Sequence, residues 1–69
     1  MNVSDALILG FIRTFTEKHG YPPTMREIGK GVGLRSSATV HWHIQQLVAR
    51  GLISYVRGSP RTIRVLTIP

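Results

Sequence analysis

The sequence predicts a small α+β domain, mainly helical, in which three helices precede a C-terminal two-stranded β-hairpin. Three observations lead to this prediction. Apolar residues recur with helical spacing through residues 4–50, and Gly and Pro interrupt that spacing at two connectors. After Gly51, two short apolar runs flank a cluster of turn residues. Because 69 residues leave room for one domain, we expect a single domain over residues 1–69.

The first helix is expected over about residues 4–19, with Ser4 or Asp5 at its start and Gly20 at its end. Four apolar side chains follow the i, i+3, i+4, i+7 spacing of one buried stripe: Ile8, Phe11, Ile12 and Phe15. The segment Tyr21-Pro22-Pro23 predicts a rigid, extended connector, because proline fixes its own φ and restricts the residue before it.

The second helix is expected over about residues 24–32. Thr24 and Glu27 match the capping box that opens a helix, and Ile28 and Val32 are its inward residues. Glycines at positions 29, 31 and 33 each disfavour a helix by about 1 kcal/mol relative to alanine. They predict close backbone packing, a short turn, or both.

The third helix is expected over about residues 36–50, after a turn at 33–36. Ser36 or Ser37 can cap this helix, and Gly51 is placed to end it. The hairpin is expected over about residues 52–67, with strands at Leu52–Val56 and Thr62–Leu66 around a turn. This order of elements is that of a three-helix winged helix-turn-helix, in which the hairpin is the wing.

The charge balance indicates a polyanionic partner. Nine Lys or Arg residues and three acids give a net charge of +6. DNA, RNA and an anionic membrane all qualify on charge alone, but the basic residues are spread from Arg13 to Arg64 rather than along one helix face. This favours a folded basic surface. No apolar run is long enough to span a membrane, and the start of the chain lacks the pattern of a signal peptide.

The third helix has one apolar and one polar face. At about 100° per residue, the apolar face collects Val40, Ile44, Leu47 and Val48. The opposite side has no acid and no lysine, and it carries Ala38, Thr39, His41, Trp42, Gln45, Gln46 and Ala49. These groups can read base edges in the major groove, where a helix-turn-helix places the start of its second helix, here Ser36 to Trp42. Ordinary solvated surface is the alternative interpretation.

Trp42 allows three interpretations, since a large aromatic side chain that faces away from the core is usually buried somewhere. Its ring can fold down against the hairpin or a neighbouring helix. It can contact DNA, or it can form an interface with another protein.

The arginines around the hairpin and the turn are expected to hold DNA phosphates. Three lie in or beside the hairpin, and two flank the turn near helix N-termini. Solvated surface charge is the alternative for any single one. The expected backbone-contacting set is Arg26, Arg35, Ser37, Arg57, Ser59, Arg61 and Arg64.

Residue content excludes several kinds of chemistry. The sequence has no Cys, hence no disulfide, cysteine–zinc site or thiol nucleophile, which fits a reducing cytosol. His41 and His43 point about 200° apart on a helix and cannot share one ion, so we expect no metal and no cofactor. We find no nucleophile–base pair, carboxylate pair or phosphate-cradling loop, and therefore expect no enzyme activity.

Specific motifs carry a family resemblance: Tyr21-Pro22-Pro23-Thr24-x-Arg26-Glu27-Ile28-Gly29, then Val32-Gly33-Leu34-x-Ser36-Ser37-x-Thr39-Val40-His41-x-His43-Ile44, then Leu47 and Gly51-Leu52-Ile53. They resemble the N-terminal DNA-binding domain of the LexA family of SOS repressors. Pro60-Arg61-Thr62-Ile63 is similar to the last hairpin of that domain. The resemblance covers nearly all 69 residues.

The resemblance implies a sequence-specific repressor module that binds double-stranded DNA in the bacterial cytoplasm, encoded by a bacterium or a phage. In that family the second helix of the helix-turn-helix reads operator bases and the wing contacts the DNA backbone. By position, the base-reading set is Ser36, Ala38, Thr39, His41 and Trp42, to which the helix face adds Gln45. Trp42 departs from the family pattern, which has a smaller or polar residue there, and this leaves the operator sequence open.

Full repressors of this family continue into a self-cleaving Ser-Lys peptidase domain that also dimerises, and 69 residues leave no room for it. We expect either an isolated domain or a complete small relative, with a monomer in solution and a dimer on DNA as an open alternative. The alternative function is a winged-helix protein-interaction module that binds a larger repressor or polymerase. Trp42 supports that alternative, and the basic wing opposes it.

Overall fold

The computed structural model describes residues 5–66 and confirms a mainly helical α+β domain. Its elements, in chain order, are α1 (Asp5–His19), α2 (Met25–Val32), α3 (Ser37–Ala49), β1 (Ile53–Ser54) and β2 (Arg64–Val65). Ser4 and Thr67, at the outer limits of the expected first helix and hairpin, lie outside the described residues. Within residues 5–66, no helix is both long and apolar enough to cross a membrane.

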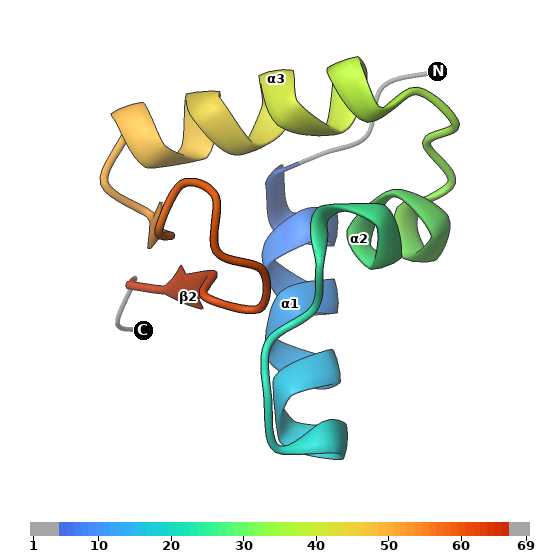
Figure 1. Cartoon of the computed structure of the whole chain (residues 1–69), viewed down its shortest axis with the longest axis vertical. Coiled ribbons are helices and arrows are strands. Elements are labelled where there is room, and N and C mark those ends of the chain that lie inside the picture. Colours follow the sequence, from blue (N-terminus) through green and yellow to red (C-terminus); the bar gives the residue numbers. More distant parts are fainter. Residues whose placement is uncertain (1–4, 67–69) are drawn as a thin grey trace.

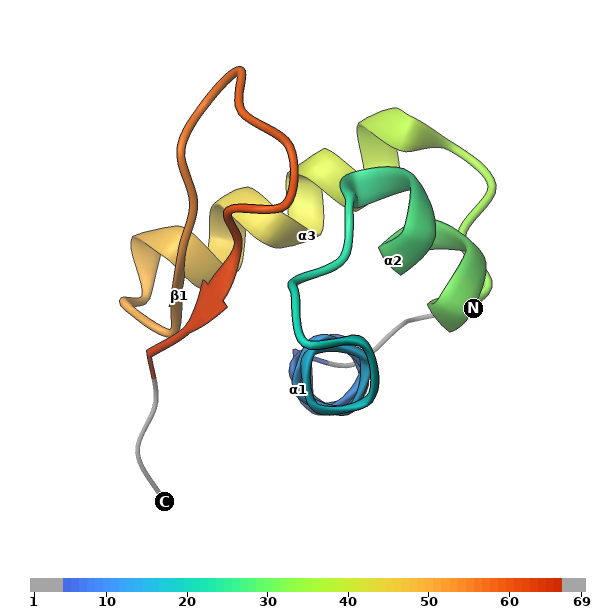
Figure 2. The same ribbon diagram turned by 60° about the horizontal axis from the view of Figure 1, so that its bottom comes forward.

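The three helices pack around one core and leave the outer side of α3 uncovered. In Figure 1, α3 runs across the top, α1 runs steeply below it, and α2 lies beside α1 under the start of α3. The hairpin lies near the other end of α3, and the loop between its strands rises beside α3 in Figure 2. Each helix, β1 and the segment before β2 contribute to the core: Ile8, Ile12, Ile28, Val40, Ile44, Leu47, Ile53 and Ile63.

α2 begins and ends as its sequence predicts. Thr24 is the N-cap, and the Thr24–Glu27 capping box is complete in both directions. Gly33 ends the helix in the left-handed conformation, with φ 83°, and its N–H donates to the Gly29 carbonyl. These caps satisfy backbone groups that an eight-residue helix would otherwise leave unpaired, and they fix the turn that leads to α3.

The two glycines within α2 allow this helix to approach its neighbours closely, which confirms the expected tight packing. A Cβ atom at position 31 would lie 2.1 Å from Cε1 of Phe11 on α1. One at position 29 would lie 2.9 Å from Cγ2 of Val40 on α3. Both separations are shorter than van der Waals contact, so only glycine fits with α2 in its present position.

The hairpin has shorter strands than the expected Leu52–Val56 and Thr62–Leu66. Only Ile53 and Ser54 pair with Val65 and Arg64, in antiparallel register. The ladder stops because the Val56 N–H donates to Thr62 Oγ1 at 2.8 Å rather than to a strand carbonyl. The wing is therefore an ordered loop, residues 55–63, on a short two-stranded base.

We expect Gly31→Ala to destabilise the fold by about 1–3 kcal/mol, because the added methyl group would displace the Phe11 ring. Gly10→Ala is the matched control on α1, where a Cβ atom would meet nothing within 4 Å. That substitution should stabilise the protein by roughly 0.5–1 kcal/mol through helix propensity. Urea unfolding of both variants measures the difference, and equal stability of the two would contradict the packing argument.

Candidate nucleic-acid interface

α3 presents its N-terminal part to solvent. Ser36 is the N-cap and its hydroxyl accepts the Thr39 N–H at 3.4 Å, while Val40 and Ile44 on the inner face are buried. All six side chains predicted to read bases are exposed: Ser36, Ala38, Thr39, His41, Trp42 and Gln45. Their accessibility is what base contact requires, and the contacts themselves stay a prediction.

Trp42 is not packed onto the domain. Its side chain is 59% exposed, and among the described residues its ring contact is an edge-on approach to His43 of the same helix, at 5.0 Å between centroids. The interpretation in which the ring folds down against the wing or a neighbouring helix does not match this geometry. The two remaining interpretations of the Trp42 ring are contact with DNA and contact with another protein.

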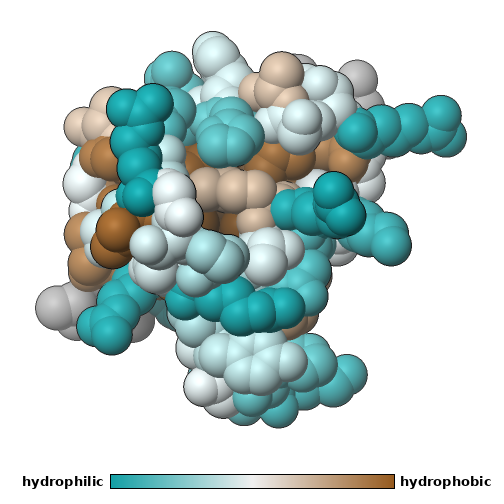
Figure 3. Space-filling view, viewed as in Figure 1, coloured by the Kyte–Doolittle hydropathy of each residue, from teal (hydrophilic) through white to brown (hydrophobic). Residues whose placement is uncertain are grey.

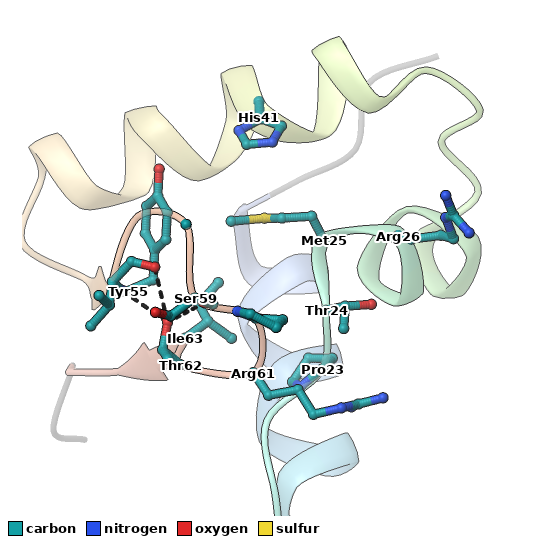
Figure 4. Close-up of a pocket in the computed structure, with 13 residues that line it drawn as sticks. Pro23, Thr24, Met25, Arg26, His41, Tyr55, Ser59, Arg61, Thr62 and Ile63 are labelled. Carbon is teal, nitrogen blue, oxygen red and sulfur yellow. Dashed lines mark hydrogen bonds between the residues drawn. The ribbon is translucent and has the colours of Figure 1, made fainter.

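A hydrogen bond ties the middle of α3 to the wing. Gln45 Nε2 donates to the Tyr55 hydroxyl at 2.5 Å, and Figure 4 shows the Tyr55 ring pointing from the wing towards α3. Within the wing, Thr62 Oγ1 also donates to the Ser59 carbonyl at 3.0 Å. The predicted base reader Gln45 is therefore held by the wing through one of its amide hydrogens, and its amide oxygen is left for another partner.

Arg61 makes several contacts within the domain. Its guanidinium donates to both carboxylate oxygens of Glu27, at 2.9 and 3.1 Å, and to the Pro22 carbonyl at 3.1 Å. It also lies over the Tyr21 ring, 4.6 Å from the centroid. In Figure 4 the side chain reaches from the wing past Pro23 towards α2. The sequence prediction that Arg61 binds a DNA phosphate remains untested by these contacts, which occupy much of its hydrogen-bonding capacity.

The same arrangement changes the acidity of Glu27. The hydrogen bond from the Arg61 guanidinium, followed by the bond from the Thr24 backbone N–H, lowers the Glu27 pKa below its ordinary value of 4.5. The carboxylate therefore stays charged to lower pH than an ordinary glutamate, and it serves both as helix cap and as partner of the wing.

A groove of about 360 Å³ opens between the wing, the start of α2 and the flank of α3. His41 borders it from α3, Arg26 and Met25 from α2, and Tyr55 and Ser59 from the wing (Figure 4). In Figure 3, apolar surface lies beneath α3, with hydrophilic side chains projecting on either side of it. The groove brings the predicted backbone contacts Arg26 and Ser59 together with the predicted base reader His41.

A second hollow lies at the N-terminus of α3 and is strongly basic. Its lining includes Arg26, Lys30 and Arg35, together with Ser36 and Ser37. Arg26 borders both hollows, so cationic and hydroxyl side chains form a continuous rim from the start of α3 to the wing. Such a rim suits a phosphate backbone.

Arg64 stands apart from this rim. Arg64 lies on β2 and borders a different groove, shared with Arg13 and Glu17 of α1. Arg57 is exposed in the wing loop next to Gly58. Of the predicted backbone contacts, the structure gathers five around the two hollows, Arg26, Arg35, Ser37, Ser59 and Arg61, and it leaves Arg64 near α1.

Three residues of this surface were missed by sequence reasoning. Lys30 was not among the predicted contacts, although its spacing of four from Arg26 places both on one side of a helix. Local sequence patterns could not predict the bond of Tyr55 to Gln45 or the ion pair of Glu27 with Arg61. The two partners lie 10 residues apart in the first case and 34 in the second.

An exposed second helix in a helix-turn-helix, a hairpin beside it and a basic rim define a winged helix-turn-helix DNA-binding domain. The comparisons with known proteins agree with this class. A family model described as the LexA DNA binding domain matches residues 4–62. The chain belongs to the LexA DNA-binding domain family.

Several curated LexA repressors are similar to this chain. The repressor of Exiguobacterium sp. is 48% identical over 67 residues, covering 97% of this chain and 32% of the relative. The repressor of Lacticaseibacillus casei is 53% identical over 58 residues, covering 84% and 28%. The repressor of Bacillus licheniformis is 49% identical over 59 residues, covering 86% and 28%. The chain spans about a third of the length of these relatives.

The Glu27 ion pair should make stability depend on pH in the acid range. Since the native pKa of Glu27 is lowered, its contribution is fully present above about pH 4.5 and is lost as pH falls through the native pKa. Urea midpoints of the parent and Glu27→Gln should therefore differ at neutral pH and converge as pH falls. Glu17→Gln on α1 is the control, and a Glu27→Gln difference that stays constant from pH 7 to 3 would contradict this assignment.

Proposed function

We propose that this chain is the operator-reading module of a LexA-like transcriptional repressor, binding double-stranded DNA sequence-specifically. The observation that carries the proposal is the exposed N-terminal part of α3 beside the basic rim of Arg26, Lys30 and Arg35. A helix of this kind enters the major groove, while cations at its start hold the flanking phosphates. The similarity to curated LexA repressors supports the repressor role.

The base contacts are assigned to one stripe of α3. Thr39 and His41 offer a hydroxyl and an imidazole, Gln45 offers its amide oxygen, and Ala38 and Trp42 offer apolar surface for a thymine methyl group. Ser36 stands at the helix start, where its cap role and a base-edge contact are compatible.

The phosphate contacts are assigned to the rim and the wing tip. Arg26, Arg35 and Ser37 would hold the backbone near the start of α3, and Arg57 and Ser59 would hold it from the wing. Arg64 would reach phosphate only at the outer edge of such a complex, since it borders the groove beside α1. These contacts position the domain without carrying sequence information.

The assembly on DNA is a separate part of the proposal. The LexA relatives are about three times as long as this chain, and we propose that this domain alone occupies a single half-site as a monomer. Trp42 favours a second candidate function, the docking of another protein, because its ring is 59% exposed on the same helix. Selection of bound sites from random duplexes tests both, since a protein-docking module would enrich no sequence.

Binding to duplex DNA should weaken steeply with salt. For about four to six phosphates, log K should fall with log salt at a slope near −4 to −5. Titrations between low and moderate salt on one selected duplex measure this slope. Retained binding with a flat salt response would remove the electrostatic part of the proposal.

Thr39→Ala should separate base reading from folding. The side chain is exposed on α3, so the melting temperature should hardly change. Affinity for the selected duplex should fall by about 1–3 kcal/mol, with little change on random DNA, if a base contact is lost. Ile44→Ala is the contrasting variant, because its buried side chain leaves a cavity that costs about 2–5 kcal/mol of stability.

Trp42→Ala distinguishes the two remaining interpretations of that ring. Contact with DNA predicts parent-like melting with weaker binding to the selected duplex. Docking of another protein predicts no change in either measurement. A large loss of stability would contradict the exposure of the ring.

A further inference from the structure

Arg61 combines an unusual backbone conformation with a side chain whose guanidinium is held by several hydrogen bonds. It is the one non-glycine residue within residues 5–66 with a positive φ, 59°, a conformation that L-residues rarely adopt. We propose that Arg61 is a positioning residue: with Glu27 it locks the wing onto the N-terminus of α2 and sets where the wing tip meets DNA. The inference rests on the proposed wing contact with the DNA backbone.

The geometry of the Arg61 side chain suits a clamp better than a phosphate contact. Nη1 and Nη2 donate to the two oxygens of one carboxylate, the bidentate arrangement in which arginine differs from lysine. Nη1 also donates to the Pro22 carbonyl, and the Tyr21 ring covers the guanidinium face. Three separate groups of the connector and α2 thus hold the tip of one wing side chain.

Glu27 joins this clamp to the helix cap. Its Oε1 accepts the Thr24 N–H at 2.8 Å as well as the Arg61 bond, while its own N–H donates to Thr24 Oγ1 at 3.2 Å. One carboxylate therefore fixes both the start of the helix-turn-helix and the wing. The position of the wing relative to α3 becomes part of the same rigid unit.

Because the ladder is short, the position of the wing loop depends on contacts outside the ladder. Two residue pairs, Ile53–Val65 and Ser54–Arg64, form its base, and nine residues, 55–63, lie beyond them. Thr62 holds the loop together internally, Ile63 is buried in the core at its end, and Gln45 ties Tyr55 to α3. The Arg61–Glu27 pair adds the attachment to α2 from the opposite side of the groove.

Glu27→Gln gives opposite results for a clamp and for a phosphate contact. Glutamine keeps the capping box but loses the charged bidentate pair. A clamp predicts binding to a selected duplex about three- to tenfold weaker, although the variant is one charge more positive. A phosphate-binding Arg61, once released from Glu27, would bind as well as the parent or better. Glu17→Gln, the same charge change on α1, is the control and should not weaken binding.

Arg61→Lys provides the second measurement. Lysine can still contact a phosphate as a point charge, but it cannot span both oxygens of Glu27. The clamp predicts weaker binding, a salt slope reduced by about one, and no additional loss in the Glu27→Gln/Arg61→Lys double variant. Arg13→Lys on α1 is the matched control. Thermal melts verify that each variant is folded at the temperature of the binding assay.

The outcomes separate the clamp from the function on which it rests. The clamp is supported if DNA binding is weakened in Glu27→Gln and Arg61→Lys. Binding by the controls Glu17→Gln and Arg13→Lys should then equal that of the parent. Parent-like binding by Arg61→Lys, together with weakened Arg57→Ala, overturns the clamp and leaves the wing contact standing. Parent-like binding by Arg57→Ala as well overturns the wing contact, and the clamp falls with it.

Discussion

The close approach of α2 to both of its neighbours is the constraint on which the rest of the structure depends. Backbone hydrogens at Gly29 and Gly31 face Val40 and Phe11, where any Cβ atom would collide. This packing fixes α2 between α1 and α3 and so sets the angle of the helix-turn-helix. The two glycines lower the intrinsic stability of an eight-residue helix, and the caps at Thr24 and Gly33 offset part of this loss.

From that packing follows the division of α3 into two faces. Val40, Ile44 and Leu47 complete the core, so the side chains opposite them have no domain surface to cover them. The turn before α3 brings its N-terminus next to Arg26 and Lys30 of α2. A helix start has unpaired N–H groups and a partial positive charge. The basic rim and the start of α3 therefore both attract an anion to the same place.

The wing is held less by its own strands than by side chains from the helices. With two pairs in the ladder, the loop is held by the buried side chain of Ile63, by Gln45 of α3 and by Glu27 of α2. Sheet pairing fixes the base of the hairpin, and these polar contacts hold the loop at Tyr55 and Arg61, on either side of its tip. Tyr55 and Arg61, the wing residues of these two contacts, both border the groove.

The sequence by itself determined the number, order and type of the elements, because caps, glycine stops and apolar periodicity act within a few residues. The Thr24–Glu27 box, the buried stripe of α3 and the exposure of Thr39 and His41 could all be predicted in this way. Only the tertiary structure decided the length of the strands, the partner of Arg61, and which arginines lie together. Those outcomes depend on contacts between residues far apart in the chain, such as Glu27 and Arg61, for which local patterns carry no signal.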